Sequence, residues 1–181
     1  MRTADDVLQF WFVEHGKDDW FGGKPEFDAE LEAAFAGTHP HVALGEAWGW
    51  RSSAEGRLAE VIVLDQFSRQ LHRGSAEAFA QDKMALVLAQ EAIAAGADQA
   101  LDSTRRAFFY LPFMHAESLV IQDEGVRLYE ALGDADQLDF MRKHRAVIER
   151  FGRFPFRNKA LGRESTDAEI AYMSEQGDRA F

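Results

Sequence analysis

The sequence has no cysteine, and this absence excludes several kinds of site. A chain without thiols forms no disulfide, offers no cysteine nucleophile and holds none of the zinc or iron–sulfur centres that need cysteine ligands. The sequence has six histidines. Two of them, His39 and His41, flank a proline, where a surface turn explains them better than a metal site with only two ligands. We therefore expect neither a metal nor a cofactor.

Long apolar runs are missing as well. None approaches the roughly 20 residues that a membrane-spanning helix needs. Asp5 and Asp6 stand where a signal peptide requires apolar residues. The sequence thus predicts a cytoplasmic protein without a membrane partner.

Positive charge is in short supply: 20 Lys and Arg stand against 31 Asp and Glu, a formal net charge of −11. The field of such a chain repels phosphate backbones, so we expect no nucleic-acid partner, and any cationic site must be local. A length of 181 residues with 46% hydrophobic composition suits one core. This predicts a single domain over residues 1–181.

Strand signals are absent too. The sequence has no useful stretch of alternating apolar and polar residues and no Asn-Gly or Asp-Gly hairpin turn. Instead, the residues of an apolar helix stripe recur at three- and four-residue spacing, for example Leu138, Met141, His144, Ile148 and Phe151. This pattern predicts an all-α fold of antiparallel helical hairpins. Because no internal repeat is detectable, a tetratricopeptide-like superhelix and a closed helical bundle both stay open.

Several residues predict where helices begin and end. Thr3 and the capping box Thr166-Asp-Ala-Glu169 begin the first and last helices. The span 76–96 is rich in helix formers and is expected to be the longest helix. Pro112 must kink or end its helix because it lacks a backbone donor, and the helical pattern resumes over 113–132.

Asp65, Arg69 and Arg73 form a first polar constellation. Placed four residues apart, they are expected along one stripe of a helix in an apolar segment. An exposed ion pair of this kind contributes only about a few tenths of a kcal/mol. In apolar surroundings, however, such charges must be paired or serve a purpose. A structural ion pair and the wall of a pocket are therefore both open interpretations.

A second constellation begins after the proline. On a regular helix His115, Ser118 and Gln122 share one face, while Glu117 points elsewhere. Such a cluster can line a cleft, but the second histidine of the His-Glu-x-x-His zinc motif is missing. His144 lies on an apolar helix stripe, where a hydrogen-bonded core histidine and a functional histidine both fit.

The clearest chemical signal is a run of cations in the stretch Phe151–Arg163 and just before it. No acid occurs between Glu149 and Glu164, while five cations do. They are Arg150, Arg153, Arg157, Lys159 and Arg163. Because like charges repel at this density, they need counter-charges from acids of the fold or from a bound anion.

The same stretch is expected to be a loop that leads into the last helix. Pro155 biases Phe154 toward an extended backbone. Arg163 comes just before a helix N-terminus, which is unfavourable for a cation unless something negative lies between them. Asp167 and Glu169 are internal candidates for that negative charge, and a carboxylate or phosphate ligand is the alternative.

Segments along nearly the whole chain resemble one bacterial family, the domain of unknown function 924. The residues that carry the resemblance are Phe10-Trp-Phe12, Leu64-Asp-Gln-Phe67, Arg69, Arg73-Gly74, Phe79, Asp82, Pro112, His115, Glu117, Gln122, His144, Arg150-Phe-Gly-Arg-Phe-Pro155, Arg157-Asn158 and Leu161-Gly-Arg163. The block from Arg150 to Thr166 is the most specific part. The resemblance implies an all-helical fold similar to tetratricopeptide-like superhelices, and it implies no particular activity.

Three positions depart from the family pattern. Phe156 stands where a histidine is usual, Ser68 where a proline is common, and Ala116 where a serine is common. These departures put in doubt an acid–base role at position 156 and any mechanism that needs a hydroxyl next to His115.

Three hypotheses follow, and none of them fixes a reaction class, an enzymatic activity or an oligomeric state. The first is a pocket for a small anionic ligand, with Asp65, His115 and Glu117 as candidates for proton transfer. Its candidate ligand-binding residues are Arg69, Arg73, Gln122, Arg153, Arg157, Asn158 and Arg163. The second is a module in which the same arginines anchor an acidic peptide or partner helix. The third is a purely structural ion network.

Overall fold

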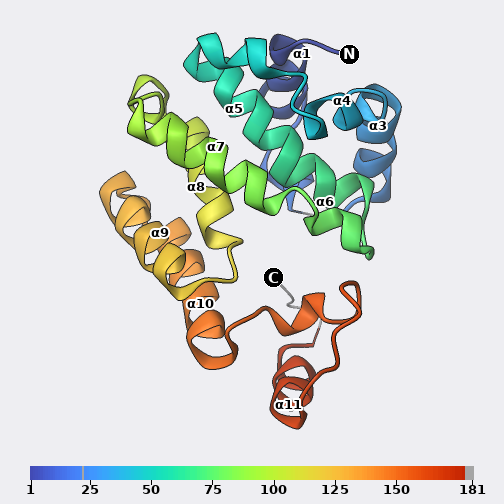
Figure 1. Ribbon diagram of the computed structural model, residues 1–181, viewed down its shortest axis with the longest axis vertical. Helices are drawn as coiled ribbons and strands as arrows, with labels where there is room; N and C mark the ends of the chain where they lie inside the picture. Colours follow the sequence, from blue (N-terminus) through green and yellow to red (C-terminus); the bar gives the residue numbers. More distant parts are fainter. Residues whose placement is uncertain (22, 178–181) are drawn as a thin grey trace. The chain divides into compact units, whose positions relative to one another are not determined.

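The structure is a computed structural model that describes residues 1–21 and 23–177 (Figure 1). Gly22 and residues 178–181, which the expected domain includes, lie outside the described residues. Every regular element of the described chain is helical, which confirms the all-α prediction. The α-helices are α1 (Ala4–Gln9), α2 (Lys17–Trp20), α3 (Pro25–Phe35), α4 (His39–Ala43), α5 (Ala54–Ile62), α6 (Ser68–Leu71), α7 (Asp82–Ala94), α8 (Ser103–Met114), α9 (Leu119–Leu132), α10 (Ala135–Phe151) and α11 (Asp167–Gln176).

Shorter turns interrupt these helices. Two are π-helical, η1 (Phe10–Glu14) and η3 (Val63–Phe67), and four are 3₁₀ turns, η2 (Trp48–Ser52), η4 (Ala76–Phe79), η5 (Asp98–Ala100) and η6 (Pro155–Arg157). No helix among the described residues is both long and apolar enough to cross a membrane.

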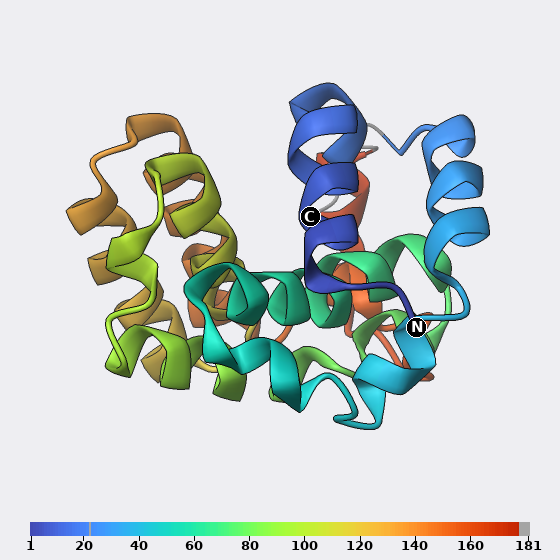
Figure 2. The same ribbon diagram turned by 90° about the horizontal axis from the view of Figure 1, so that it is seen from above.

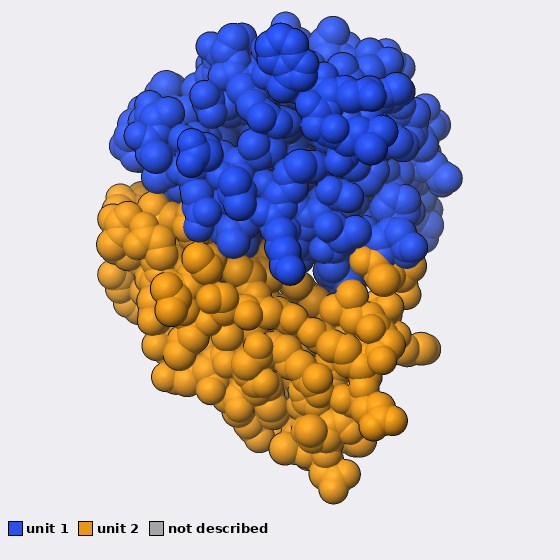
Figure 3. All heavy atoms as spheres, in the orientation of Figure 1, with its two compact units in different colours: residues 1–73, 77–112 blue, residues 74–76, 113–181 orange. Residues whose placement is uncertain are grey.

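The chain groups into two compact units, coloured separately in Figure 3. Unit 1 comprises residues 1–73 and 77–112, and unit 2 comprises residues 74–76 and the chain from 113 onward. α8 therefore begins in unit 1 and ends in unit 2. That the chain forms a single domain stays a prediction.

Unit 1 is built around α5. Ser53 caps this helix by accepting a hydrogen bond from the Gly56 amide. The helix contacts α1, α7 and η2, and Figure 2 shows α1 crossing it. Its apolar side chains Leu58, Val61 and Ile62 are buried, as their spacing predicts.

Aromatic rings fill the rest of the unit 1 core. The Trp11 ring lies 5.7 Å from Trp20 and 5.5 Å from Phe67, and the Phe10 ring lies 5.1 Å from Phe35. Trp11 and Phe67 come from the π-helical turns η1 and η3. A π-helical turn has one residue more than an α-turn, so it shifts the side chains that follow it around the helix axis.

Unit 2 begins with a hairpin of α9 and α10, which lie side by side in Figure 1. Gly133 closes it in the left-handed region with a φ of 81°, and Asp134 then caps α10. α10 has 17 residues and exceeds every other described helix. The prediction that the span 76–96 forms the longest helix is therefore wrong: α7 has only 13 residues, because residues 76–79 form η4.

The break near Pro112 falls later than predicted. α8 continues past Pro112 to Met114, residues 115–118 are not helical, and α9 starts at Leu119. Pro112 removes one backbone N–H donor, yet the helix continues for two residues beyond it. His115 and Glu117 are thereby placed in a short connection rather than on a helix.

Candidate functional site

The loop after α10 is held by a clamp between Glu117 and Arg163. Gly152 ends α10 with a φ of 70°, and Phe154 is extended before Pro155, as predicted. The Glu117 carboxylate accepts hydrogen bonds from Arg163 Nη1 at 2.7 Å and Nη2 at 2.9 Å, and from the Phe154 amide at 2.8 Å. Arg163 thus has an internal counter-charge.

Arg153 has one as well. Its Nε and Nη2 donate to the two carboxylate oxygens of Glu169 at 2.6 and 2.8 Å, and Nη2 also donates to the Glu164 carbonyl at 2.8 Å. The predicted capping box orients Glu169: its Oε2 accepts from the Thr166 amide at 2.8 Å. Hydrogen bonds from Arg153 lower the pKa of Glu169 to about 2. The sequence offered Glu169 as the counter-charge of Arg163, whereas in the structure Glu169 pairs with Arg153 and Arg163 pairs with Glu117.

Asn158 links the two ion pairs. Its Oδ1 accepts from Arg163 Nε at 2.9 Å, and its Nδ2 donates to Ser165 Oγ at 3.1 Å and to Glu169 Oε2 at 3.4 Å. Arg157 is buried close by, with its guanidinium 4.6 Å from the centre of the Phe154 ring. A continuous hydrogen-bonded network therefore runs from Glu117 to Arg153 through residues that the sequence assigned to ligand binding.

This network also determines the chemistry of Glu117. Burial raises the pKa of Glu117, but hydrogen bonds from Arg163 and the Phe154 amide, with the charge of Arg157, lower it by more. The net effect is a pKa below the usual value. A carboxylate with a lowered pKa and both oxygens occupied is a poor general base.

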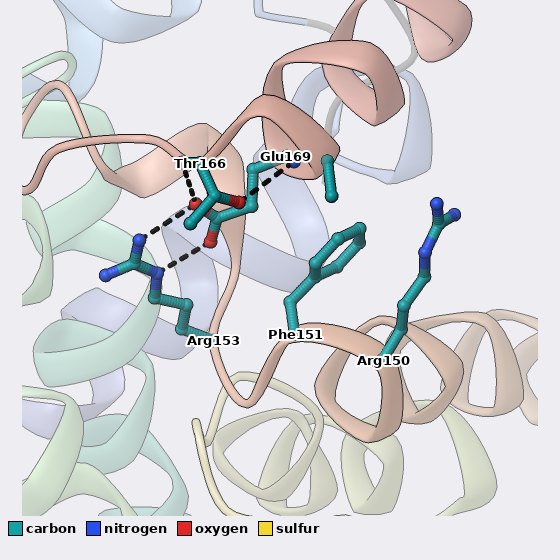
Figure 4. Close-up of a pocket in the computed structure, with 6 residues that line it drawn as sticks. Arg150, Phe151, Arg153, Thr166 and Glu169 are labelled. Carbon is teal, nitrogen blue, oxygen red and sulfur yellow. Dashed lines mark hydrogen bonds and ion pairs between the residues drawn. The ribbon is translucent and has the colours of Figure 1, made fainter.

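Arg150 differs from Arg153 and Arg163. It is exposed in the last turn of α10, and its guanidinium forms no hydrogen bond or ion pair within residues 1–21 and 23–177. Instead it lies 4.7 Å from the centre of the Phe151 ring and 5.7 Å from that of Tyr172. Figure 4 shows its side chain extending from α10 on the other side of Phe151 from the Arg153–Glu169 pair.

Two adjoining hollows meet at Arg150, and both are open to solvent. The first has a volume of about 490 Å³ and is lined by Arg150, Phe151, Arg153, Thr166, Ala168 and Glu169 (Figure 4). The second, of about 300 Å³, shares Arg150 and Phe151 and is also lined by Lys143, Ala146, Val147, Tyr172 and Gln176. Val147 and Tyr172 belong to the hydrophobic cluster of unit 2, so the floor of the second hollow is part of a packed core.

Gln122 and His115 do not share a helix face. Ser118 occupies the N-cap position of α9, so the expected shared face of His115, Ser118 and Gln122 is wrong. Gln122 is fully buried, and its Nε2 donates to the carbonyls of Met114 at 2.8 Å and Ala116 at 2.9 Å. The residue thereby caps the end of α8.

His144 is buried in unit 2, with His115 as a neighbour. Its Nδ1 donates to the Phe140 carbonyl at 2.8 Å, its ring meets Phe154 edge-on at 5.7 Å, and the His115 ring centre lies 6.5 Å away. These contacts are those of a hydrogen-bonded core histidine.

Asp65, Arg69 and Arg73 belong to unit 1, whereas the cation-rich loop belongs to unit 2. Asp65 pairs with Arg69 at 3.1 Å, as predicted, and Arg69 also binds Asp82 at 2.8 Å. The row does not continue to Arg73, because η3 shifts the helical register and α6 ends at Leu71. Arg73 instead pairs with Asp28 at 2.9 Å.

The two histidines beside Pro40 have separate partners. His39 is buried, which corrects the expectation of a surface turn, and its Nε2 is 2.7 Å from Ser68 Oγ. His41 Nδ1 is 2.5 Å from Glu46 Oε2. No group of three His, Asp or Glu side chains in the described part of the chain is placed to hold a metal ion.

Sequence reasoning counted Arg150 among the cations but assigned it no ligand. The local signal was its position next to Phe151 at the end of an amphipathic helix. Its second aromatic neighbour, Tyr172, comes from α11, and no local pattern relates the two helices. Conversely, the paired state of Arg153, Asn158 and Arg163 depends on acids that tertiary packing brings to them.

Comparisons with known proteins give a family and a fold. The profile of a family described as a bacterial protein of unknown function (DUF924) matches residues 7–177. A solved structure, described as a protein of unknown function, ATU0120 from Agrobacterium tumefaciens, is similar with a TM-score of 0.91 and 41% sequence identity. The match covers 95% of this chain and 97% of that one. No curated protein matches the sequence.

Proposed function

The chain belongs to this bacterial family of unknown function, DUF924, and we propose that it has a binding function in which Arg150 holds a carboxylate or phosphate group in the hollow between α10 and α11. The proposal keeps the anionic ligand expected from the sequence and assigns it to a different arginine. Arg153 and Arg163 then serve to build the wall of the site.

One observation carries the proposal, namely the contrast between Arg150 and the paired arginines of unit 2. Arg153 and Arg163 each bind a glutamate through two hydrogen bonds, and Arg142 on α10 pairs with Glu130 at 2.8 Å. Arg150 is held by aromatic rings instead. Stacking fixes the plane of a guanidinium while its N–H edge stays available, and this edge matches a carboxylate or phosphate through two parallel hydrogen bonds.

The acid inside the hollow does not compete for Arg150. Glu169 is the one carboxylate among the lining residues, and both of its oxygens accept hydrogen bonds from Arg153. Its low pKa, about 2, reflects that engagement. An incoming anion therefore meets Arg150 without having to displace an internal partner.

The geometry favours binding over catalysis. None of the residues that line the two hollows is among the candidates for proton transfer, Asp65, His115 and Glu117. Glu117 is occupied by Arg163, and Asp65 lies in unit 1 with Arg69. A general acid or base must reach the proton it transfers, so no reaction is assigned to this site.

A thermal-shift series tests the proposal. Inorganic phosphate, succinate and citrate are added in turn to the full chain, together with phosphorylated and carboxylated metabolites. A ligand at a hundredfold excess over its dissociation constant stabilises the folded state by about 2.7 kcal/mol and so raises the melting temperature. We expect Arg150→Ala to abolish the increase.

Arg142→Ala is the matched control, because Arg142 is an exposed arginine of the same helix that already has an acidic partner. The control should respond to the anions as the unmodified chain does. An anion that stabilises the Arg150→Ala variant as much as the unmodified chain would contradict the proposal, and so would a complete lack of response to all the anions.

A further inference from the structure

The second hollow indicates what the anionic group is attached to. We infer that the ligand is an acidic segment of another protein in which a bulky apolar side chain lies next to the Asp or Glu that meets Arg150. The inference rests on the proposed function, since it takes Arg150 as the anion-binding group. It adds the chemical class of the partner and a second contact surface.

The second hollow lies between one face of α10 and one face of α11. One face of α10 lines this hollow. It consists of the residues at positions i, i+3, i+4, i+7 and i+8, namely Lys143, Ala146, Val147, Arg150 and Phe151. Tyr172 and Gln176, four residues apart on α11, complete the second hollow. The hollow is therefore a groove between two helices, with apolar side chains in its floor and cations along α10.

The floor of this groove is rigid. Val147 and Tyr172 are buried with Ile148 and Phe154, and Phe151 packs against the same cluster. The first turn of α11 is fixed by its capping box, and the loop before it is fixed by the Glu117–Arg163 clamp. A preformed surface loses little conformational entropy when a ligand binds. Contacts in both hollows can therefore add to the affinity.

The shape of the surface argues against a free small molecule. Pockets for small ligands typically bury roughly 70–90% of the ligand's surface. Here both hollows are open, and a small carboxylate at Arg150 does not fill the second hollow, where Ala146 and Phe151 keep exposed apolar surface. A peptide that places an aromatic or branched aliphatic side chain over these residues, and its neighbouring acid on Arg150, uses both hollows at once.

Charge complementarity identifies the acid of the segment. Arg150 is without an acidic partner among the described residues, and it lies where the two hollows meet. Lys143, farther along the groove, already pairs with Asp139 at 2.6 Å. A nucleic acid presents a phosphate at every nucleotide and needs several unpaired cations, so one available arginine in a chain of net charge −11 fits a single carboxylate better.

The experiment is a selection followed by a binding measurement. The full chain is immobilised at physiological salt and used to select peptides from a random display library. We expect enrichment of Asp or Glu adjacent to Phe, Tyr, Trp, Leu or Ile. One selected peptide is then synthesised with a fluorophore, and its affinity is measured by fluorescence polarisation.

Three protein variants and two peptide variants complete the design. Arg150→Ala should weaken binding by about tenfold or more, and changing the peptide acid to its amide should add little further loss in that variant. Ala146→Glu places a like charge and added bulk in the second hollow at an exposed position, so it should weaken binding to a similar degree. Changing the apolar peptide residue to Ser should do the same, whereas Arg142→Ala should have no effect.

The outcomes separate the inference from the function on which it rests. If succinate or phosphate binds through Arg150 while the apolar peptide residue and Ala146→Glu make no difference, the inference is wrong and the anion site stands. If selected peptides bind the Arg150→Ala variant as well as the unmodified chain, the inference is wrong, and the proposed function is wrong too only if succinate and phosphate also stabilise that variant as much as the unmodified chain. Self-association that is lost in Arg150→Ala and is unaffected by peptide would overturn the inference in favour of a second copy of this chain.

Discussion

The guanidinium groups of Arg153 and Arg163 each meet a carboxylate supplied by the fold. Glu169 is 2% exposed, and Glu117 is bound by both Arg163 and a backbone amide. Removing Arg153 leaves the buried charge of Glu169 without its partner. At the residue scale, therefore, arginines at the end of α10 and in the loop after it have different roles: Arg153 and Arg163 stabilise the fold, while Arg150 faces the solvent.

This difference predicts different stabilities for two alanine variants. Arg153→Ala should lower the free energy of unfolding by clearly more than Arg150→Ala does, because Glu169 and the Glu164 carbonyl lose their donor. Arg150→Ala should lower it by at most about 1 kcal/mol, the contribution of an exposed cation–π contact. Urea denaturation at neutral pH measures both values. Equal losses in the two variants would contradict the division of roles.

A second residue-scale prediction concerns acid stability and His39. Burial, with a smaller contribution from His72, lowers the pKa of His39 to about 4. In the unfolded chain the histidine binds a proton below about pH 6.5, whereas in the folded chain it stays neutral until about pH 4. Acid therefore favours unfolding, and the stability that neutral His39 contributes to the fold is lost as the pH falls from about 6.5 to about 4.

The His39→Gln variant isolates this effect, because an amide nitrogen can still donate to Ser68 Oγ and does not titrate. Between pH 7.5 and 5.5 the unmodified chain should lose roughly 1 to 1.5 kcal/mol more stability than the variant. Urea titrations at both pH values give the comparison. The same pH dependence in both proteins would show that His39 is protonated as readily in the folded chain as in the unfolded one.

At the scale of single elements, local rules predicted what local interactions control. The caps at Thr3 and Thr166 depend on a side chain and an amide three residues away, and both form. The late end of α8 was not predictable from Pro112 alone, because Gln122 on α9 donates to the carbonyl of Met114, the last residue of α8. The π-helical turns η1 and η3 have no sequence signature comparable to a cap, so the shift at Arg73 could not be foreseen.

Gly56 gives a prediction that runs against helix propensity. Alanine is normally favoured over glycine inside a helix by about 1 kcal/mol. At Gly56, however, a Cβ would lie 2.0 Å from the carbonyl oxygen of Trp50, a backbone atom that cannot turn away. Gly56→Ala should therefore destabilise the fold by roughly 1–3 kcal/mol or more.

Gly125→Ala is the comparison within the same chain. Its added Cβ would meet Met141 Cε at 2.8 Å, the mobile end of a flexible side chain. We expect a smaller loss of stability there, measured by urea denaturation of both variants. A Gly56→Ala variant as stable as the unmodified chain would mean that α5 and η2 do not approach each other as described.

At the scale of the whole molecule, the sequence predicted the helical class and the family, while the grouping of helices was beyond its reach. Apolar periodicity identifies a helix and its buried face without identifying the helix on which that face packs. The partners Glu117 and Arg163, for instance, are 46 positions apart in the chain. Net charge, in contrast, is a sum over the sequence, so the expectation of no nucleic-acid partner needs no knowledge of the fold.

Because the chain groups into two compact units, calorimetry can show whether it unfolds in one transition or in two. α8 is one continuous helix that belongs to both units, so we expect a single transition in differential scanning calorimetry. The calorimetric and van 't Hoff enthalpies should then agree. Two resolved transitions, or a calorimetric enthalpy well above the van 't Hoff value, would show that the units unfold separately and that the chain has two domains.

The most direct test of the central claim is an NMR titration of the arginine side-chain Nε–Hε signals with succinate and with inorganic phosphate. Without ligand, the signals of Arg153 and Arg163 should already show the downfield shifts of strong hydrogen bonds, to Glu169 and to Asn158. We predict that added anion moves the Arg150 signal in a saturable way while those of Arg153 and Arg163 stay in place. Movement of the Arg153 and Arg163 signals with a stationary Arg150 signal would contradict the account.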